Sequence, residues 1–227
     1  MSTEPTSRLY QYTYKIRAIL VVVLFFFGVA FASDINLTPV LEHAKSKYGD
    51  NGLAIVEQWS KLLEQAKSEQ DTQKLKSVND FFNKNIRYLD DDVIWQQKDY
   101  WATPLETLGL RKGDCEDYVI AKYFSLMMIG IEPNKLRLVY VKAKLNGTSQ
   151  AHMVLAYYPT SNAIPLILDN LRYDILPALE RQDLTPVYSF NSDGLWVGQE
   201  QTSRSNDPAS RMSRWRDVLT RMKIEGF

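Results

Sequence analysis

The chain changes from helical to strand-like sequence just after residues 111–130, which read RKGDCEDYVIAKYFSLMMIG. Within this stretch Asp114 has a side chain that caps helix N-termini, and Gly130 is typical of a helix end. Between these two residues, apolar side chains recur at the spacing of one helix face. The stretch therefore predicts a central helix whose apolar face consists of Tyr118, Ala121, Phe124 and Met128.

The sequence before the central helix predicts further helices. Apolar residues keep helical spacing through residues 38–49, 53–67 and 75–86, and a glycine ends the first of these segments. Thr103-Pro104-Leu105-Glu106 has the composition of a capping box and is expected to start a short helix. Residues 90–101 show no period, so we expect a long loop there.

The sequence after the central helix alternates between apolar and polar residues, as strands do. Asn146-Gly147, which separates two such runs, is a strong local signal of a β-hairpin. Helices followed by an antiparallel sheet make an α+β fold, which is the predicted fold class. The expected strands cover residues 136–143, 151–158, 164–169, 187–190 and 195–198.

Composition and charge exclude several classes of protein. The 227 residues include 27 Lys and Arg, 27 Asp and Glu, and 45% hydrophobic residues, which is typical of a globular protein rather than a disordered or coiled-coil chain. A net charge of zero provides no basic field, so we expect no nucleic-acid partner. One cysteine and two histidines exclude an internal disulfide, a zinc ribbon and a His-rich metal site.

The N-terminal segment has the pattern of an export signal. Basic residues precede an apolar run from Ala18 to Ala30, and Ala30-Phe31-Ala32 has small residues at the two positions that a signal peptidase reads. The run is shorter than the roughly 20 residues of a spanning helix, which favours cleavage over retention as an anchor. We expect a cleaved signal peptide at residues 1–32, no stable membrane insertion afterwards, and a single domain at residues 33–227.

Cys115 is the only thiol of the chain, and it lies among charged residues directly after Gly113-Asp114. Most free cysteines are small buried side chains, but this setting favours a functional thiolate at a helix N-terminus. His152 is the one credible base, although a histidine on an apolar strand is more often structural. Asp169 ends the next strand and could orient the imidazole. Together, the three residues predict a Cys-His-Asp triad.

Four sequence blocks follow one another in an order that is typical of one enzyme family. They read Trp101-Ala-Thr-Pro-Leu-Glu, Gly113-Asp-Cys-Glu-Asp-Tyr, Ala151-His-Met-Val-Leu and Leu168-Asp-Asn-Leu. In these blocks the chain resembles the bacterial transglutaminase-like cysteine proteinases, over roughly residues 35–198. The resemblance implies a papain-like, transglutaminase-like core in which Cys115 is the nucleophile, His152 the base and Asp169 the orienting group.

Asp114, Glu116 and Asp117 surround Cys115 with negative charge, which raises the pKa of a thiol. Such residues are common as a helix cap with an acidic first turn, but three carboxylates within four residues also suit a hard cation. The resemblance implies calcium dependence, with Asp114, Glu116 and Asp117 as ligands. Calcium takes about six to eight oxygens, so backbone carbonyls, waters or the Asp90–Asp92 run would supply the others.

The resemblance also implies a location, a substrate and a partner. The adhesin-releasing members of this family suggest a calcium-dependent periplasmic endopeptidase that cuts a large cell-surface adhesin near its N-terminus and frees cells from a biofilm. The implied partner is an inner-membrane receptor that senses cyclic di-GMP and sequesters the enzyme. Two alternatives stay open, namely amide transfer of the transglutaminase type and a non-catalytic calcium-binding or docking module.

Two further segments allow more than one interpretation. Trp95, Tyr100 and Trp101 could wall a cleft, support the oxyanion or pack under a loop, and the backbone N–H of Cys115 is the preferred oxyanion donor. Basic and apolar residues alternate over residues 211–223, as in a membrane-surface or partner helix. The favoured interpretation is an amphipathic helix that packs on the domain.

Overall fold

The computed structural model describes residues 35–198, 203, 207 and 212–227. The predicted signal peptide at residues 1–32 lies outside this part of the chain. Residues from Ile35 onward cluster in one compact unit. Within the described ranges, no helix combines the length and the apolar character that crossing a membrane requires.

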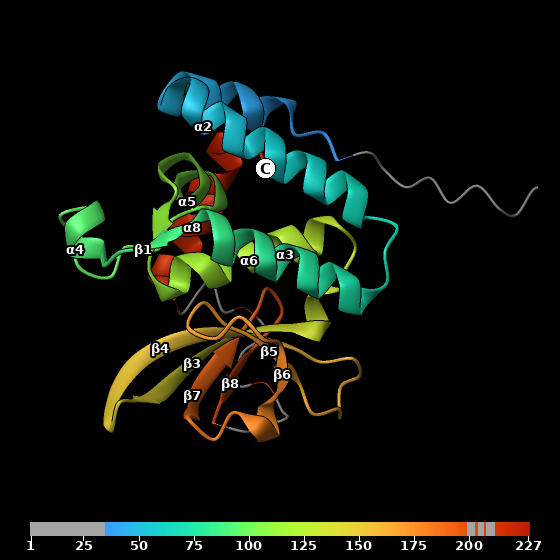
Figure 1. Cartoon of the computed structure of the whole chain (residues 1–227), viewed down its shortest axis with the longest axis vertical. Coiled ribbons are helices and arrows are strands. Elements are labelled where there is room, and N and C mark those ends of the chain that lie inside the picture. Colours follow the sequence, from blue (N-terminus) through green and yellow to red (C-terminus); the bar gives the residue numbers. More distant parts are fainter. Residues whose placement is uncertain (1–34, 199–202, 204–206, 208–211) are drawn as a thin grey trace, which may run out of the picture. The chain divides into compact units, whose positions relative to one another are not determined.

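One layer of this unit is helical, and a β-sheet forms the other layer (Figure 1). Both parts of the predicted helix pair at residues 38–67 occur in α2, which is bent at Gly49, where φ is 67°. Glycine adopts this left-handed conformation without a steric cost, so the chain changes direction there. The helices of this layer are α2 (Thr38–Ala66), α3 (Asp71–Asn85), α5 (Pro104–Leu110), α6 (Cys115–Met128) and α8 (Ser213–Glu225).

The region at residues 90–101 differs from the predicted loop because it contains one helical turn, α4 (Asp91–Ile94). A short parallel pair, β1 (Arg87–Tyr88) and β2 (Lys112–Gly113), flanks this region and was not predicted. Two-residue strands leave no readable alternation in the sequence, so only the pairing itself reveals them. The pair is small, but it holds α4 next to the start of α6.

The sheet has six strands in the order β6-β5-β4-β3-β7-β8, and every neighbouring pair is antiparallel. The predicted hairpin turn lies at Asn146 and Gly147, both with positive φ. β6 was not predicted, and its Pro177 is tolerated because the strand lies at the sheet edge. The strands are β3 (Leu136–Leu145), β4 (Thr148–Tyr157), β5 (Leu166–Leu168), β6 (Leu176–Pro177), β7 (Leu184–Phe190) and β8 (Leu195–Val197), and 3₁₀ turns occur at η1 (Pro133–Lys135) and η2 (Ala178–Glu180).

The central helix α6 lies between the other helices and the sheet. It packs on α3 and α5 on one side and on β4 on the other. All residues from Asp117 to Leu126 are buried, so the predicted single apolar face is too narrow a description of this helix. The N-terminus of α6 therefore lies where the two layers meet, and the predicted α+β fold is confirmed.

The C-terminal helix α8 packs on the same core. Trp215, Val218 and Met222 are buried along one side of it, and the Trp215 ring stacks on Phe124 of α6. This arrangement supports the interpretation of the segment as an amphipathic helix that covers the domain.

Candidate active site

Cys115 is the first residue of α6, and Asp114 is the N-cap residue before it. The backbone N–H of Asp114 donates a hydrogen bond of 3.3 Å to Oδ2 of Asp117, one turn into the helix. The predicted helix start at Asp114 is therefore confirmed. Because α6 begins at the boundary of the two layers, its first turn is next to the sheet.

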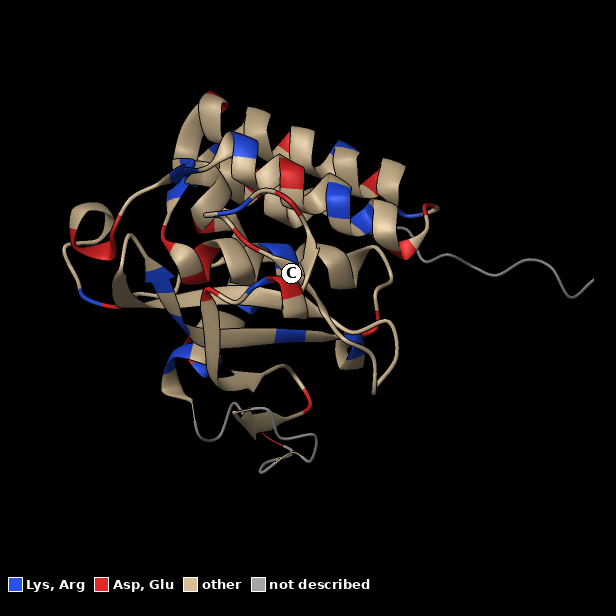
Figure 2. Cartoon of the chain, turned by 60° about the horizontal axis from the view of Figure 1, so that its bottom comes forward, with Lys and Arg blue, Asp and Glu red and all other residues tan. Residues whose placement is uncertain are grey.

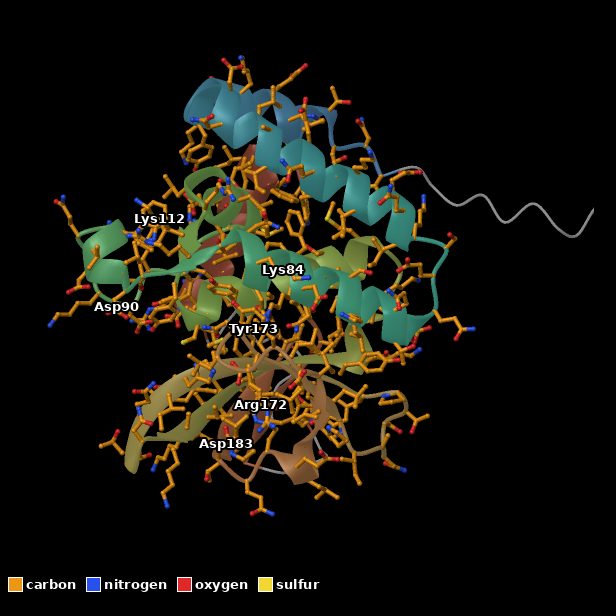
Figure 3. The ribbon with its side chains drawn as sticks, in the orientation of Figure 1. Lys84, Asp90, Lys112, Arg172, Tyr173 and Asp183 are labelled. Atoms are coloured by element: carbon orange, nitrogen blue, oxygen red, sulfur yellow. The ribbon has the colours of Figure 1, made fainter. Side chains whose placement is uncertain are left out.

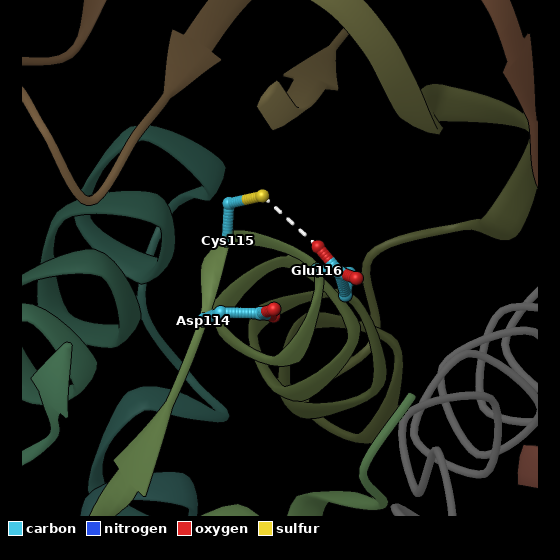
Figure 4. Close-up of side chains that lie close together, drawn as sticks. All are labelled: Asp114, Cys115 and Glu116. Carbon is cyan, nitrogen blue, oxygen red and sulfur yellow. Dashed lines mark hydrogen bonds between the residues drawn. The ribbon is translucent and has the colours of Figure 1, made fainter. Parts of the chain in front are cut away.

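The thiol of Cys115 faces acidic side chains (Figure 4). Its Sγ donates to Oε2 of Glu116 over 2.9 Å, so the described hydrogen bond of the thiol goes to Glu116 and not to His152. Burial raises the pKa of the thiol well above its usual range, and the charges of Glu116 and Asp114 raise it further. The backbone N–H of Met153 faces the sulfur and opposes this shift in pKa. The contact with Met153 places Cys115 against β4, beside the residue that follows His152.

His152 and Asp169 lie on neighbouring strands and form a hydrogen-bonded pair. His152 belongs to β4 and Asp169 directly follows β5, which pairs with β4. Nε2 of His152 lies 2.8 Å from Oδ1 of Asp169, and both side chains are buried. Because an ionised carboxylate only accepts hydrogen bonds, Nε2 carries the proton and Nδ1 is the nitrogen with a free lone pair.

The carboxylate of Asp169 has further partners on both of its oxygens. The backbone N–H of Leu171 donates to Oδ1 at 3.0 Å, and Nη2 of Arg181 donates to Oδ2 at 2.7 Å. Burial would raise the pKa of Asp169, but the hydrogen bonds from His152, Leu171 and Arg181 lower it to about 2. Asp169 is therefore an anion at neutral pH, as an orienting group must be.

A second group of carboxylates lies beside Cys115. Asp91, Asp114 and Asp117 each offer an oxygen atom, and these atoms lie within 4.8 Å of one another. The backbone N–H of Leu89 donates to the carbonyl of Gly113 at 3.1 Å, which fixes the start of α4 beside the start of α6. The structure thus selects Asp91 from the Asp90–Asp92 run that the sequence left open.

Glu116 lies on the thiol side of this cluster. Its carboxylate forms a separate close group with Asp114 and the sulfur of Cys115. Asp114 belongs to both groups, so it connects the carboxylate cluster with Cys115. The three acids predicted as metal ligands are therefore close to Cys115, but Asp117 and Glu116 belong to different groups, which share Asp114.

The carboxylates of the cluster repel one another, and hydrogen-bond donors in the described part of the chain do not reach all of their oxygens. Burial raises the pKa of Asp114 to about 10 and that of Asp91 to about 6, and neighbouring carboxylates contribute to both shifts. Oδ1 of Asp91 and Oδ1 of Asp114 are buried and have no hydrogen-bond partner among the described residues. Buried carboxylate oxygens without a partner are costly, and oxygen ligands of this type are those that calcium prefers. The residues present therefore fit a calcium ion.

The aromatic residues before Cys115 pack against other side chains. The indole N–H of Trp101 donates to Oδ1 of Asp99 at 3.1 Å, and its ring stacks on Phe190. Trp95 and Tyr100 pack against each other with ring centroids 4.4 Å apart. Of the interpretations that the sequence allowed, this geometry supports packing under a loop.

Comparison with known proteins agrees with this geometry. The family profile of the bacterial transglutaminase-like cysteine proteinases matches residues 55–197. The chain belongs to this family. The cysteine protease activity of the family requires a cysteine, and Cys115 is the only one present. The predicted transglutaminase-like fold is thereby confirmed.

Solved structures of LapG from Legionella pneumophila are similar to the chain over most of its length. LapG is 36% identical in sequence, and the match covers 83% of this chain. The EGTA-treated form gives a TM-score of 0.73 over 98% of LapG, and the calcium-bound form gives 0.72 over 99%. No protein of curated function matches the chain. LapG has thus been solved both with bound calcium and after EGTA treatment.

Proposed function

We propose that the chain is a calcium-dependent cysteine endopeptidase that uses Cys115, His152 and Asp169 as its triad. The observation that carries this proposal is the 2.8 Å hydrogen bond between Nε2 of His152 and the ionised Asp169. His152 belongs to β4. The next residue of this strand, Met153, directs its backbone N–H at the sulfur of Cys115. The arrangement leaves Nδ1 of His152 to act on the thiol.

In the proposed reaction, Nδ1 of His152 takes the proton of the thiol and Sγ of Cys115 attacks the scissile carbonyl carbon. The imidazolium is stabilised by the carboxylate of Asp169 and then protonates the leaving amine. In the second half of the reaction, the neutral imidazole of His152 takes a proton from a water molecule, whose oxygen attacks the thioester carbonyl carbon. The C–S bond then breaks, the carboxylic acid product leaves, and His152 gives the water proton to Sγ. The backbone N–H of Cys115, at the N-terminus of α6, is the proposed donor to the oxyanion.

We propose that Asp91, Asp114 and Asp117 hold the calcium ion, with Glu116 at the thiol side. A bound calcium ion supplies positive charge beside these carboxylates and satisfies their oxygens. The partnerless oxygens of Asp91 and Asp114 support this assignment. The carboxylates of Glu116 and Asp114 raise the pKa of the thiol, so neutralising them favours thiolate formation.

We further propose that the substrate is a large cell-surface adhesin, which is cut near its N-terminus in the periplasm to release cells from a biofilm. The proposed regulator is an inner-membrane receptor that senses cyclic di-GMP and sequesters the enzyme. The resemblance of the four sequence blocks to the adhesin-releasing members of the family supports both proposals, and so does the signal-like segment at residues 1–32.

The proposal is tested with a purified N-terminal adhesin fragment, calcium and a tagged primary amine. We expect a new N-terminus in the released fragment and no incorporation of the amine, because water rather than an amine resolves the thioester. The Cys115→Ala variant should fold normally and cut nothing, since it lacks the nucleophile. Cleavage by this variant would contradict the cysteine mechanism, and crosslinked amine without new termini would indicate a transglutaminase instead.

A further inference from the structure

Arg181 is a buried cation next to the His152–Asp169 pair and has no place in the proposed triad. It is 4% exposed and directly follows the 3₁₀ turn η2. Besides the 2.7 Å bond from Nη2 to Asp169, its guanidinium donates two bonds to Asp183, from Nε at 2.9 Å and from Nη2 at 2.8 Å. The two bonds to Asp183 thus fix the orientation of the guanidinium, which donates its third bond to Asp169.

The contacts of Asp169 divide between its two oxygens. Oδ1 accepts from the imidazole of His152 and the N–H of Leu171, whereas Oδ2 accepts from Arg181. Rotation of the carboxylate about its Cβ–Cγ bond would break both sets of hydrogen bonds. Without Arg181, Oδ2 of Asp169 would be a buried acceptor with no hydrogen-bond partner. The carboxylate could then turn away from His152 to find another donor for Oδ2.

We propose that Arg181 is a positioning residue that fixes the carboxylate plane of Asp169 and, through it, the imidazole of His152. The inference rests on the proposed triad. Arg181 is held in turn by Asp183, whose carbonyl accepts a 2.8 Å hydrogen bond from the N–H of Lys144 at the end of β3. Figure 3 labels Asp183 on the sheet side of the molecule. The support for the triad thus extends into the sheet.

A purely structural role would give Arg181 a different effect. In that case the guanidinium would only join the turn at residues 178–183 to the sheet, and its loss would lower stability without moving His152. The chain has only two histidines, His43 and His152, so an NMR spectrum of protein with ¹⁵N-labelled histidine separates the two roles. The proton on Nε2 of His152 reports directly on the hydrogen bond to Asp169.

The experiment compares Arg181→Gln and Arg181→Lys with Arg172→Gln, which changes an exposed arginine three residues after Asp169. We expect Arg181→Gln to shift or broaden the Nε2–H signal of His152 and to lower kcat by about 10- to 100-fold, because small displacements of catalytic groups have effects of this size. KM should stay within about twofold, since Arg181 is buried and its hydrogen bonds go to Asp169 and Asp183. Arg181→Lys should recover part of kcat, and Arg172→Gln should match the wild type.

Two results would overturn the inference. One is an Arg181→Gln protein with a lower melting temperature but an unchanged His152 signal and unchanged kcat. The other, used if Arg181→Gln does not fold, is an Arg181→Lys protein in which both readouts equal those of the wild type. Failure of the proposed function has a different signature, because cleavage would then persist in Cys115→Ala whatever happens to the His152 signal.

Discussion

At the scale of single residues, the proposed chemistry depends on the negative charge of Asp169, which stabilises the imidazolium of His152. The Asp169 pKa of about 2 keeps the carboxylate ionised throughout the neutral pH range, although the side chain is buried. We expect Asp169→Asn to lower kcat by about 100-fold or more with little loss of secondary structure, because an amide does not stabilise the imidazolium. Steady-state kinetics and circular dichroism measure the two effects.

The matched control for this variant is Asp174→Asn, which changes an exposed carboxylate on the same segment after β5. It should leave kcat unchanged. Equal activity in Asp169→Asn and the wild type would mean that another group orients His152, and the triad would need a different third member.

On the scale of the elements, a buried lysine of α6 donates hydrogen bonds to two asparagines of α3. Lys122 of α6 is fully buried and donates to Oδ1 of Asn79 at 2.8 Å and to Oδ1 of Asn83 at 2.7 Å. The side-chain amide of Asn83 donates to the carbonyl of Asp169, and that of Asn79 donates to the carbonyl of Tyr173. One amine thus connects two helices with the segment that carries Asp169 of the proposed triad.

The titration of Lys122 predicts a pH-dependent contribution to stability. Burial lowers its pKa to about 7 from an ordinary value near 10.5, against the attraction of Asp169 and Asp80 and beside the ring of Tyr118. Between these two values the unfolded chain binds the extra proton, so the free energy of unfolding rises with pH on account of this group. The stability of the wild type relative to Lys122→Met should therefore increase from about pH 7 towards pH 10.

Urea unfolding at several pH values measures this difference. Lys84→Met, which removes an exposed lysine from α3, is the control and should show no such trend. In Figure 3, Lys84 lies on α3. A constant difference between the wild type and Lys122→Met across this pH range would show that Lys122 has the same protonation in both states.

The junction of β2 and α6 depends on the absence of a side chain at Gly113. A Cβ atom at this position would lie 2.8 Å from Cβ of Asp117 and 3.0 Å from its Oδ2. We expect Gly113→Ala to displace Asp117 and to weaken calcium binding by about tenfold or more, as loss of a supporting contact does at metal sites. Calorimetric titration with calcium measures the affinity.

Gly147→Ala is a suitable comparison, because a Cβ there meets nothing within 4 Å although φ is +83°. It should cost about 1 kcal/mol of stability through its left-handed backbone and leave calcium affinity unchanged. Equal calcium affinity in Gly113→Ala and the wild type would exclude Asp117 from the ligands.

On the scale of the whole molecule, positive and negative charges balance, but negative charge is concentrated at the carboxylate cluster. Lys and Arg are interspersed with Asp and Glu over the helices (Figure 2), and the net charge is zero. The cluster of Asp91, Asp114 and Asp117 nevertheless concentrates carboxylates at one place. A cation that binds only the folded state raises its stability. We expect the melting temperature to rise with calcium concentration, EGTA to suppress cleavage, and magnesium to restore it poorly because it requires a stricter geometry.

Asp91→Asn and Asp92→Asn make a neighbouring pair of variants for this test. Asp91 is buried within the cluster, whereas Asp92 is exposed. The calcium-dependent rise in melting temperature should be strongly reduced in Asp91→Asn and retained in Asp92→Asn. Cys115→Ala should also retain the rise, since it keeps every carboxylate. A melting temperature and a cleavage rate that are both indifferent to calcium and EGTA would assign these acids to helix capping alone.

The sequence by itself determined the features that depend on local patterns. Helical spacing, the cap at Asp114 and the Asn146-Gly147 turn report the conformation of a few consecutive residues, so the order of helices and strands was predictable. Cys115 was predicted as the nucleophile because it is the one cysteine and lies among charged residues at a helix start, and this role stays a prediction. The strand that carries His152 and the strand that ends before Asp169 were predicted as neighbours, and the pairing of β4 with β5 confirms this. The helical turn at Asp91–Ile94 and the strands of two residues were too short for any period to show.

Only the tertiary structure decided which side chains support these residues. Arg181 reaches Asp169 after the chain has passed through an edge strand and a 3₁₀ turn, and Asp91 reaches Asp114 through the pairing of β1 with β2. Lys122 sits on a helix that sequence alone gave one apolar face, yet packing on both sides buries it completely. Spacing along the chain carries no information about such partners, because they are set by how the helical layer and the sheet pack together and by which buried charges each contact can satisfy.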